Sequence, residues 1–481
     1  MNRFFAVIPL LLPAILLAHT GSPDVVLEAS AGPYPLSIYV KTPRTIPGVA
    51  EVEIRSDSKD LRSMQLVQTL VTGAGRVFFP RPEVMRRSRA DSRLFTGSLW
   101  MMAEGSWKLR VSADGDRGAG ELYVPVPAAM RRTSTMGFFF GVVLASLGLA
   151  LVLGAASIAG ASVREGQLLP GAVPSRSNVM DARLFMAAAT TVVCGLLIGG
   201  NSWWNSEAGR YKSMLYDPLS LSLDVHFEGN LVAATSSRTR PQSASDIISD
   251  CGYFMNMYVV SIPTMEKMYH LHPEMQVAGV FTTRLPAMDA GKYRVFGDIV
   301  HANGFPETVT GEFELKAALR GEAPVGDDSQ ASAPPAGRNP DPGFSALSDK
   351  YRMVMVRGNN PVKAREVSHF TFRVESKSGR AAEDLELIMG MPADAAFVKH
   401  DRSVFAHLHP MGTAPAAAIA LVSSFAAKPK IDRSSHSLNL GLPAEVTFPY
   451  AVPSPGDYRI YVQVKRAGKI ETGTFDLTVT E

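Results

Sequence analysis

Two copies of the tetrapeptide His-Leu-His-Pro are the residues of this chain best suited to chemistry. One copy spans residues 270–273 and the other spans residues 407–410. The chain has only ten histidines in 481 residues, so four of them in two identical motifs indicate a shared role. On a β-strand, residues i and i+2 project from the same face, and each motif therefore presents two imidazoles side by side. Two such imidazoles can bind one metal ion.

Methionines surround both motifs, and each motif ends in a proline. Proline has no N–H for a strand ladder, so it ends the strand and places the imidazoles near loops, where binding sites gather. Imidazole with thioether is a ligand set that suits copper, whereas zinc more often recruits a thiolate or a carboxylate. The predicted copper ligands, one set per motif, are His270, His272, Met268 and Met275, and separately His407, His409 and Met411.

A structural role for the same residues remains an alternative. A His-x-His pair at a strand end can hydrogen-bond neighbouring carbonyls, and methionines are ordinary core residues. Asp298 and His301 are weaker candidates, either as a third ligand or as a surface pair. His19 could chelate copper through its amine if the chain is cleaved after Ala18. Phosphate-loop, nucleophile-elbow and His-Glu-x-x-His motifs are absent from the sequence, so we expect a protein that is not an enzyme.

Composition restricts the class of protein that carries these motifs. The length of 481 residues predicts several domains rather than one core. Charged residues make up 19% and hydrophobic residues 46%, a balance typical of soluble domains joined to a few membrane spans. A net charge of +3 without a concentrated basic stretch argues against nucleic acid as a partner. The two cysteines, Cys194 and Cys251, do not form a disulfide framework.

The N-terminus and two apolar runs predict export and membrane anchoring. Residues 1–18 read as a signal peptide, with an uncleaved anchor as the alternative. Residues 137–161 and 184–204 are long enough to cross a bilayer as helices, and the second run ends in tryptophans suited to a membrane interface. Buried core helices are the alternative. With a signal peptide, residues 162–183 form a short cytoplasmic loop, and the rest of the mature chain lies outside the cytoplasm.

Strand-like alternation predicts three β-rich modules: module 1 (19–130), module 2 (205–316) and module 3 (346–481). Each module ends in a similar hairpin, which begins with a glycine and has an aromatic residue two positions later; these glycines are Gly105, Gly291 and Gly456. Residues 317–345 read as a flexible linker. The predicted fold is mainly β, with three immunoglobulin-like β-sandwich modules and two transmembrane helices.

The sequence resembles known extracytoplasmic modules. Residues 95–111 are similar to YtkA-like and FixH-like modules, and the two His-Leu-His-Pro copies with Asp-Ile-Val-His at 298–301 resemble repeated domains of uncharacterised bacterial membrane proteins. The resemblance implies a sandwich fold, a membrane location and, through CopC-like copper carriers, a metal role in the envelope. In such relatives additional histidines precede the motif, whereas this chain has Cys251, Asn256 and Asp394 at those positions.

These observations predict a multi-pass protein of the bacterial inner membrane, with its soluble modules in the periplasm, that binds or handles copper. Its expected partners are the lipid bilayer and another envelope metalloprotein or membrane complex. The alternative is a scaffold that binds an envelope membrane complex and uses its histidines structurally. A ligand sensor is a weaker alternative, because the cytoplasmic loop is too short to hold an output domain.

Overall fold

The computed structural model is mainly β, and its described residues form two long helices and one short helix. The structure describes residues 24–73, 75, 80–133, 136–166, 168, 169, 171–226, 229–236, 246–320, 328, 329, 343–347, 350–356, 358, 361–424 and 442–481. The predicted signal peptide, His19 and most of the predicted linker lie outside these residues. The chain forms two compact units: unit 1 combines Met1–Ala128 with Asp217–Glu481, and unit 2 is Ala129–Tyr216.

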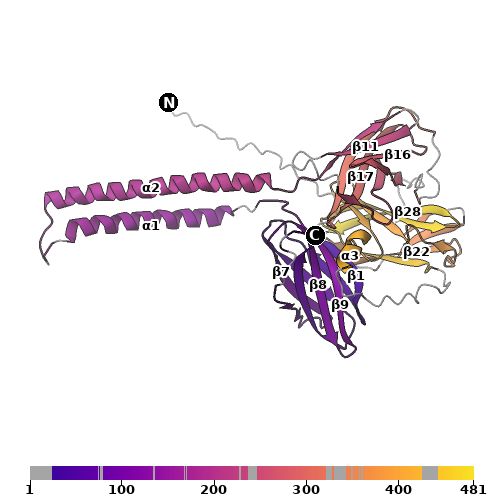
Figure 1. Ribbon diagram of the computed structural model, residues 1–481, viewed down its shortest axis with the longest axis horizontal. Coiled ribbons are helices and arrows are strands. Elements are labelled where there is room, and N and C mark those ends of the chain that lie inside the picture. Colours follow the sequence, from indigo (N-terminus) through magenta and orange to yellow (C-terminus); the bar gives the residue numbers. More distant parts are fainter. Residues whose placement is uncertain are drawn as a thin grey trace. The chain divides into compact units, whose positions relative to one another are not determined.

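Module 1 consists of two sheets (Figure 1). The first contains, in spatial order, β1 (Val25–Ala31), β2 (Tyr34–Lys41), β3 (Gly48–Arg55), β7 (Leu94–Met101) and β6 (Arg86–Arg87). The second contains β5 (Glu83–Val84), β4 (Leu61–Leu70), β8 (Gly105–Gly115) and β9 (Gly118–Ala128). Alternate residues of β3 are buried, namely Ala50, Val52 and Ile54, as expected for strands with one face on a core.

Module 2 has one long sheet whose two halves enclose a core. Its order is β14 (Met268–Leu271), β13 (Asn256–Ile262), β17 (Gly291–His301), β18 (Pro306–Leu315), β10 (Ser220–Val225), β11 (Asn230–Ser236), β16 (Val280–Arg284) and β15 (Glu274–Val277), and β12 (Ile247–Ile248) also pairs with β17. The parallel pairing of Ser220 with Thr310 joins the two halves. Buried side chains of both halves, such as Leu221, Met257 and Val295, belong to one hydrophobic cluster.

Module 3 has two sheets and the short helix α3 (Ala416–Ser423). One sheet contains β19 (Phe344–Ala346), β20 (Tyr351–Val356), β22 (Val367–Ser376) and β26 (Glu445–Ala451). The other contains β21 (Val362–Lys363), β28 (Lys469–Thr480), β27 (Gly456–Arg466), β24 (Asp394–Lys399) and β25 (Phe405–Leu408), with β23 (Leu385–Glu386) paired to β27. Aromatic residues from both sheets, including Phe372 and Phe475, fill the core between them.

The layering confirms the coarse prediction of a mainly β protein with several sheets. Modules 2 and 3 also contain matching three-strand groups, β14-β13-β17 and β25-β24-β27, in the same spatial order. In the first group Tyr258 pairs with His270 and Phe296 on its two sides. In the second group Ala396 pairs with His407 and Tyr461 in the same way. The two His-Leu-His-Pro motifs therefore occupy equivalent edge strands.

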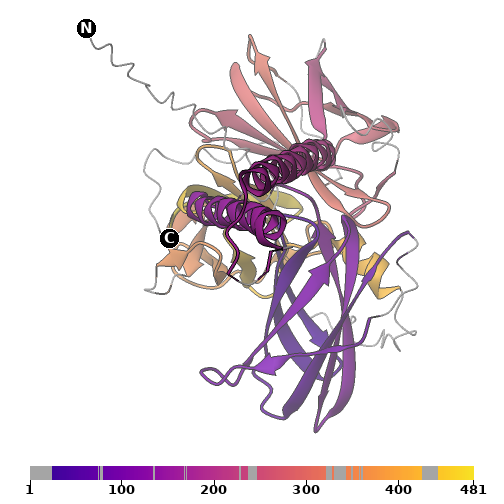
Figure 2. The same ribbon diagram turned by 90° about the vertical axis from the view of Figure 1, so that its left-hand side faces the viewer.

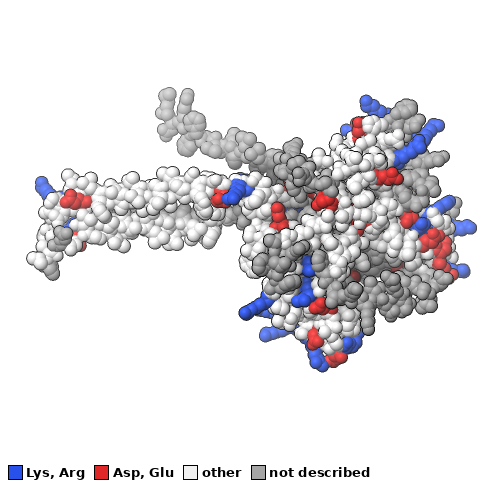
Figure 3. Space-filling model, viewed as in Figure 1, with Lys and Arg blue, Asp and Glu red and all other residues white. Residues whose placement is uncertain are grey.

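Unit 2 is a pair of long antiparallel helices, α1 (Phe138–Glu165) and α2 (Arg176–Ser213), which lie side by side (Figures 1 and 2). They approach closely at Gly160, where an added Cβ would lie 2.4 Å from Sδ of Met186. Their apolar surface is almost entirely exposed, and both are long and apolar enough to cross a membrane. Charged side chains gather only near the two ends of the hairpin (Figure 3).

Both helices extend beyond the apolar runs of residues 137–161 and 184–204. The second helix begins at Arg176, where the side chain of Ser175 accepts a hydrogen bond from the backbone N–H of Asn178. This N-cap sets the helix start, because it satisfies one of the N–H groups that have no partner within the helix. The polar turns after Trp204 remain helical up to Ser213, and module 2 begins after them.

Candidate metal centre

The outer faces of the two matching strand groups pack against each other. An apolar cluster joins Tyr258, Val260, Met265, Met268 and Phe296 of module 2 to Ala396, Val398, Phe405 and Tyr461 of module 3. The inner faces of the same strands contribute to the core of each module. Residues of β13, β14 and β24 are therefore buried on both sides of the sheet, which positions the histidine strands at the contact between the modules.

This packing brings the two histidine motifs into one cluster. The ring centroids of His270 and His272 are 4.7 Å apart, and those of His407 and His409 are 4.6 Å apart. Across the contact, the rings of His270 and His407 are 6.3 Å apart. Instead of two separate sites, one per motif, the structure places all four imidazoles at a single interface.

His407 is held between two carboxylates. Its Nε2 lies 2.7 Å from Oδ1 of Asp394, and its Nδ1 lies 3.3 Å from Oδ2 of Asp298 in module 2. Burial alone would lower the pKa of this imidazole, but the two carboxylates outweigh burial and raise the pKa to about 10. His407 is therefore a buried cation that links the two modules.

Asp394 is the anion at the centre of the cluster. Its side chain is fully buried, and Oδ2 accepts a hydrogen bond of 2.7 Å from the hydroxyl of Tyr258 across the module contact. Burial opposes ionisation, yet the charge and hydrogen bond of His407 hold the pKa of Asp394 well below its ordinary value. The carboxylate is thus ionised without access to solvent.

His270 is neutral, and one of its nitrogens has a free lone pair. Its Nδ1 lies 2.7 Å from Oε1 of Gln463, whose own amide group donates to Thr472. Since the glutamine oxygen accepts, Nδ1 of His270 carries the proton and Nε2 is a bare acceptor. Nε2 is buried and has no hydrogen-bond partner among the described residues. Burial, followed by repulsion from His272, lowers the pKa of His270 to about 3.

His409 is the second neutral imidazole with a buried Nε2 that has no hydrogen-bond partner in the described part of the chain. Burial and the charge of His407 lower its pKa to about 3. His409 also belongs to two groups whose ligand atoms lie within 4.8 Å of one another. One group is Asp394, His407 and His409, and the other is Asp250, Cys251 and His409.

The predicted methionine ligands are placed less centrally than the histidines. Met268 lies in the apolar cluster between the modules, and Met275 packs against the core of module 2. The side chain of Met411 is 40% exposed. His272 is buried, stacks on Tyr253 with ring centroids 3.7 Å apart, and lies 3.3 Å from the hydroxyl of Ser329.

Of the two weaker candidates, only Asp298 joins the cluster. His301 instead lies between Asp246 and Glu307, at 2.7 and 2.8 Å.

Described residues of the predicted flexible linker make polar contacts with module 3. Within it, Asp328 pairs with Lys465 at 2.7 Å and accepts a hydrogen bond from the backbone N–H of Met389. Polar contacts dock these linker residues, although apolar side chains for docking are scarce in that segment.

Tyr258, Gln463 and Asp250 do not stand out in the sequence as site residues, and Asp394 stands out only as a departure from a histidine pattern. The strands that contain Tyr258 and Asp394 nevertheless carry a pattern that indicates a buried polar cluster. Residues 256–260 and 394–398 are nearly continuous apolar runs, typical of strands buried on both faces rather than one. Polar residues such as Tyr258 and Asp394 inside such runs need buried partners.

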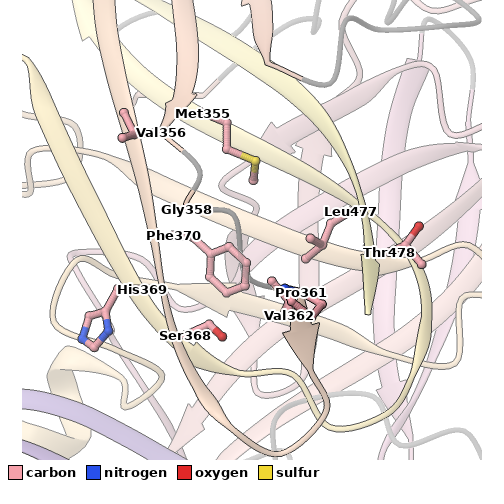
Figure 4. Close-up of a pocket in the computed structure, with 10 residues that line it drawn as sticks. All are labelled: Met355, Val356, Gly358, Pro361, Val362, Ser368, His369, Phe370, Leu477 and Thr478. Atoms are coloured by element: carbon pink, nitrogen blue, oxygen red, sulfur yellow. The ribbon is translucent and has the colours of Figure 1, made fainter. Parts of the chain in front are cut away.

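A separate pocket of about 580 Å³ opens at one end of module 3 (Figure 4). Residues of β20, β22 and β28 line it, including Met355, Phe370 and Leu477. His369 is the one titratable residue among its ten described lining residues, and it pairs with Glu28 of module 1. This pocket lacks the convergent polar groups of the histidine cluster, which is therefore the stronger candidate site.

The fold and the cluster define a mainly β protein with two candidate membrane helices and a buried histidine–carboxylate centre between two repeated modules. Residues 346–481 match the family model described as a domain of unknown function (DUF8832). No curated protein matches the chain.

Similar solved structures include part of an adhesion protein and an alpha-2-macroglobulin. A tetra-tandem repeat of a large adhesion protein is 7% identical, with 91% of this chain and 72% of that chain covered and a TM-score of 0.17. Salmonella alpha-2-macroglobulin is 8% identical, with 94% of this chain but only 24% of that chain covered and a TM-score of 0.21. Similarity at this level carries no argument about function.

Proposed function

We propose that this chain is an inner-membrane protein whose immunoglobulin-like, YtkA-like modules face the periplasm and bind copper at the contact between modules 2 and 3. The proposal includes export by the N-terminal signal peptide and two membrane passes by α1 and α2. The copper position is formed by Asp394, His407 and His409, with His270 and His272 beside it. All three ligands of this position belong to module 3, and the imidazoles of module 2 lie beside it, so the proposal replaces two independent sites, one per motif, with one centre at the contact between the modules.

The observation that carries the proposal is a pair of buried ring nitrogens, Nε2 of His270 and Nε2 of His409, for which the described part of the chain offers no hydrogen-bond partner. A buried acceptor without a partner costs roughly 1–3 kcal/mol, so it calls for an explanation such as an ion. Neutral imidazoles with free lone pairs are the form in which histidine binds metals.

The charge of the cluster also supports a cation. The imidazolium of His407 already supplies one positive charge between Asp394 and Asp298. A metal ion bound by Asp394, His407 and His409 would replace that proton as the positive charge, so the buried carboxylate keeps a partner. Tyr258 and Asp298 then act as outer partners that orient the ligands through hydrogen bonds.

The test is copper binding by the full-length protein in detergent, measured as metal retained after dialysis under oxidising and reducing conditions. We expect bound copper in the wild type and a loss on the order of tenfold in affinity for His409→Ala and for Asp394→Asn. His400→Ala is the matched control, since this exposed histidine pairs with Asp476 at the surface. Wild-type protein that retains no copper in either condition would refute the proposal.

The second candidate function is a scaffold for another envelope membrane complex. The observation that favours it is the full engagement of His407, whose two nitrogens both contact carboxylates and whose charge links the modules. In that case the histidines hold modules 2 and 3 in one orientation for a partner. The same dialysis experiment separates the two functions, because a scaffold has no need of copper.

A further inference from the structure

Cys251 occupies a strained turn beside the centre. The backbone N–H and C=O groups of Asp250 and Tyr253 pair with each other across this turn at 2.8 and 3.0 Å. Cys251 lies between them with φ of +52°, a left-handed conformation that costs energy for any residue with a Cβ. The equivalent turn of module 3 joins Ile388 to Met391 and places Met389 at φ of +50°. Both repeats therefore hold a sulfur-containing residue in a conformation that favours glycine.

His409 connects this turn to the centre. Ligand atoms of Asp250, Cys251 and His409 all lie within 4.8 Å of one another. His409 is only 4% exposed, and its Nε2 has no hydrogen-bond partner among the described residues. The carboxylate of Asp250 is fixed in place because its Oδ1 accepts a hydrogen bond of 2.6 Å from the backbone N–H of Ala417. A thiol, an imidazole and an oriented carboxylate thus converge on one buried spot.

The two groups that share His409 differ in their preference for metals. Asp394, His407 and His409 offer oxygen and nitrogen, which suit a divalent ion. Cys251 adds sulfur, and a metal that displaces the thiol proton would be bound by a soft thiolate, the ligand that selects monovalent copper. We propose that Cys251 and His409, with Asp250 beside them, form a second position that binds Cu(I) next to the position assigned under the proposed function, on which this inference rests. His409 then serves as the shared ligand of both positions.

The experiment uses the full-length chain in detergent with Cys194→Ser, so that Cys251 is the only thiol. Cu(I) is titrated anaerobically against bicinchoninate, and Cu(II) is titrated separately. We expect Cys251→Ser to weaken Cu(I) binding on the order of tenfold or more and to change Cu(II) binding less than about twofold. Met389→Ser is the matched control, because it makes a similar change at the equivalent turn of module 3 and should leave both affinities unchanged.

Alkylation of the unsubstituted thiol gives an independent readout that does not require a folded variant. One equivalent of Cu(I) should slow the reaction of Cys251 with iodoacetamide on the order of tenfold relative to copper-free protein. Copper binding with unchanged alkylation and an unaffected Cys251→Ser variant would overturn this inference and leave the proposed function intact. Absence of any copper binding by the unsubstituted chain would overturn both.

Discussion

Removal of the Asp394 carboxylate should weaken the contact between modules 2 and 3 and lower the free energy of unfolding by a large and measurable amount. The residue is fully buried. Its carboxylate accepts a hydrogen bond of 2.7 Å from the hydroxyl of Tyr258 and pairs with the imidazolium of His407 at 2.7 Å. Loss of one partner from a buried ion pair costs about 3–5 kcal/mol, because the remaining charge is left without compensation. Asp394→Ala should therefore lower the free energy of unfolding by about that amount, a sizeable share of the total for a typical domain.

Denaturant unfolding of the metal-free, full-length protein, followed by far-ultraviolet circular dichroism, measures this change. Asp289→Ala is the control, since that carboxylate is 69% exposed and pairs with Lys267 at the surface, where such pairs contribute about 0–1 kcal/mol. The double variant Asp394→Ala, His407→Ala should be less destabilised than the sum of the single variants, because the unpaired charge is then absent. A loss below about 1 kcal/mol for Asp394→Ala would show that the network does not hold the modules together.

Three further predictions follow from the fold. Gly412→Ala should destabilise the protein, because a Cβ would lie 2.0 Å from the carbonyl oxygen of Val26 in module 1 and φ is +127°; thermal unfolding measures the loss. Burial lowers the pKa of His301, but the hydrogen bonds that its ring donates to the carboxylates of Glu307 and Asp246 outweigh burial and raise the pKa overall. His301→Gln should therefore cost stability below about pH 6.5, and the difference from wild type should vanish as pH rises through the folded pKa, as unfolding at several pH values can show. Reporter fusions at Pro170 and at the C-terminus should place Pro170 in the cytoplasm and the C-terminus outside; activity of a cytoplasm-specific reporter at the C-terminus would contradict this topology.

The sequence was sufficient to predict a mainly β fold with two long apolar helices. Alternation of apolar and polar residues predicted a mainly β chain, and two uncharged runs predicted the long helices, both of which the structure confirms. The His-Leu-His-Pro motifs were recognisable because identical clusters of a rare residue stand out. Helix ends were harder to locate, because hydropathy identifies only the apolar run that fits a membrane. The helix itself starts at a cap such as Ser175, outside that run.

The common centre could not be predicted from either motif alone. The two-residue alternation of side chains along a strand shows which residues share a face. It does not show which face of another module packs against them. Tyr258 and Gln463 became part of the site only because module 2 and module 3 pack through their outer faces. Their partners lie 136 and 193 residues away in the chain, a separation at which local patterns carry no information.

Divergence between the two repeats explains why the centre has one charged and one neutral edge histidine. Strand pairing makes Asn256 equivalent to Asp394, and Asp298 equivalent to Gln463. His407 therefore contacts two carboxylates and keeps its proton, whereas the Nδ1 of His270 contacts an amide oxygen and its ring stays neutral. A symmetric arrangement with carboxylates at all four positions would bury four negative charges against two imidazoliums, at a large cost in desolvation. The exchange of acid for amide at one position in each module leaves two carboxylates, the cation of His407 and the neutral imidazole of His270 at these positions, a combination that a metal ion can enter.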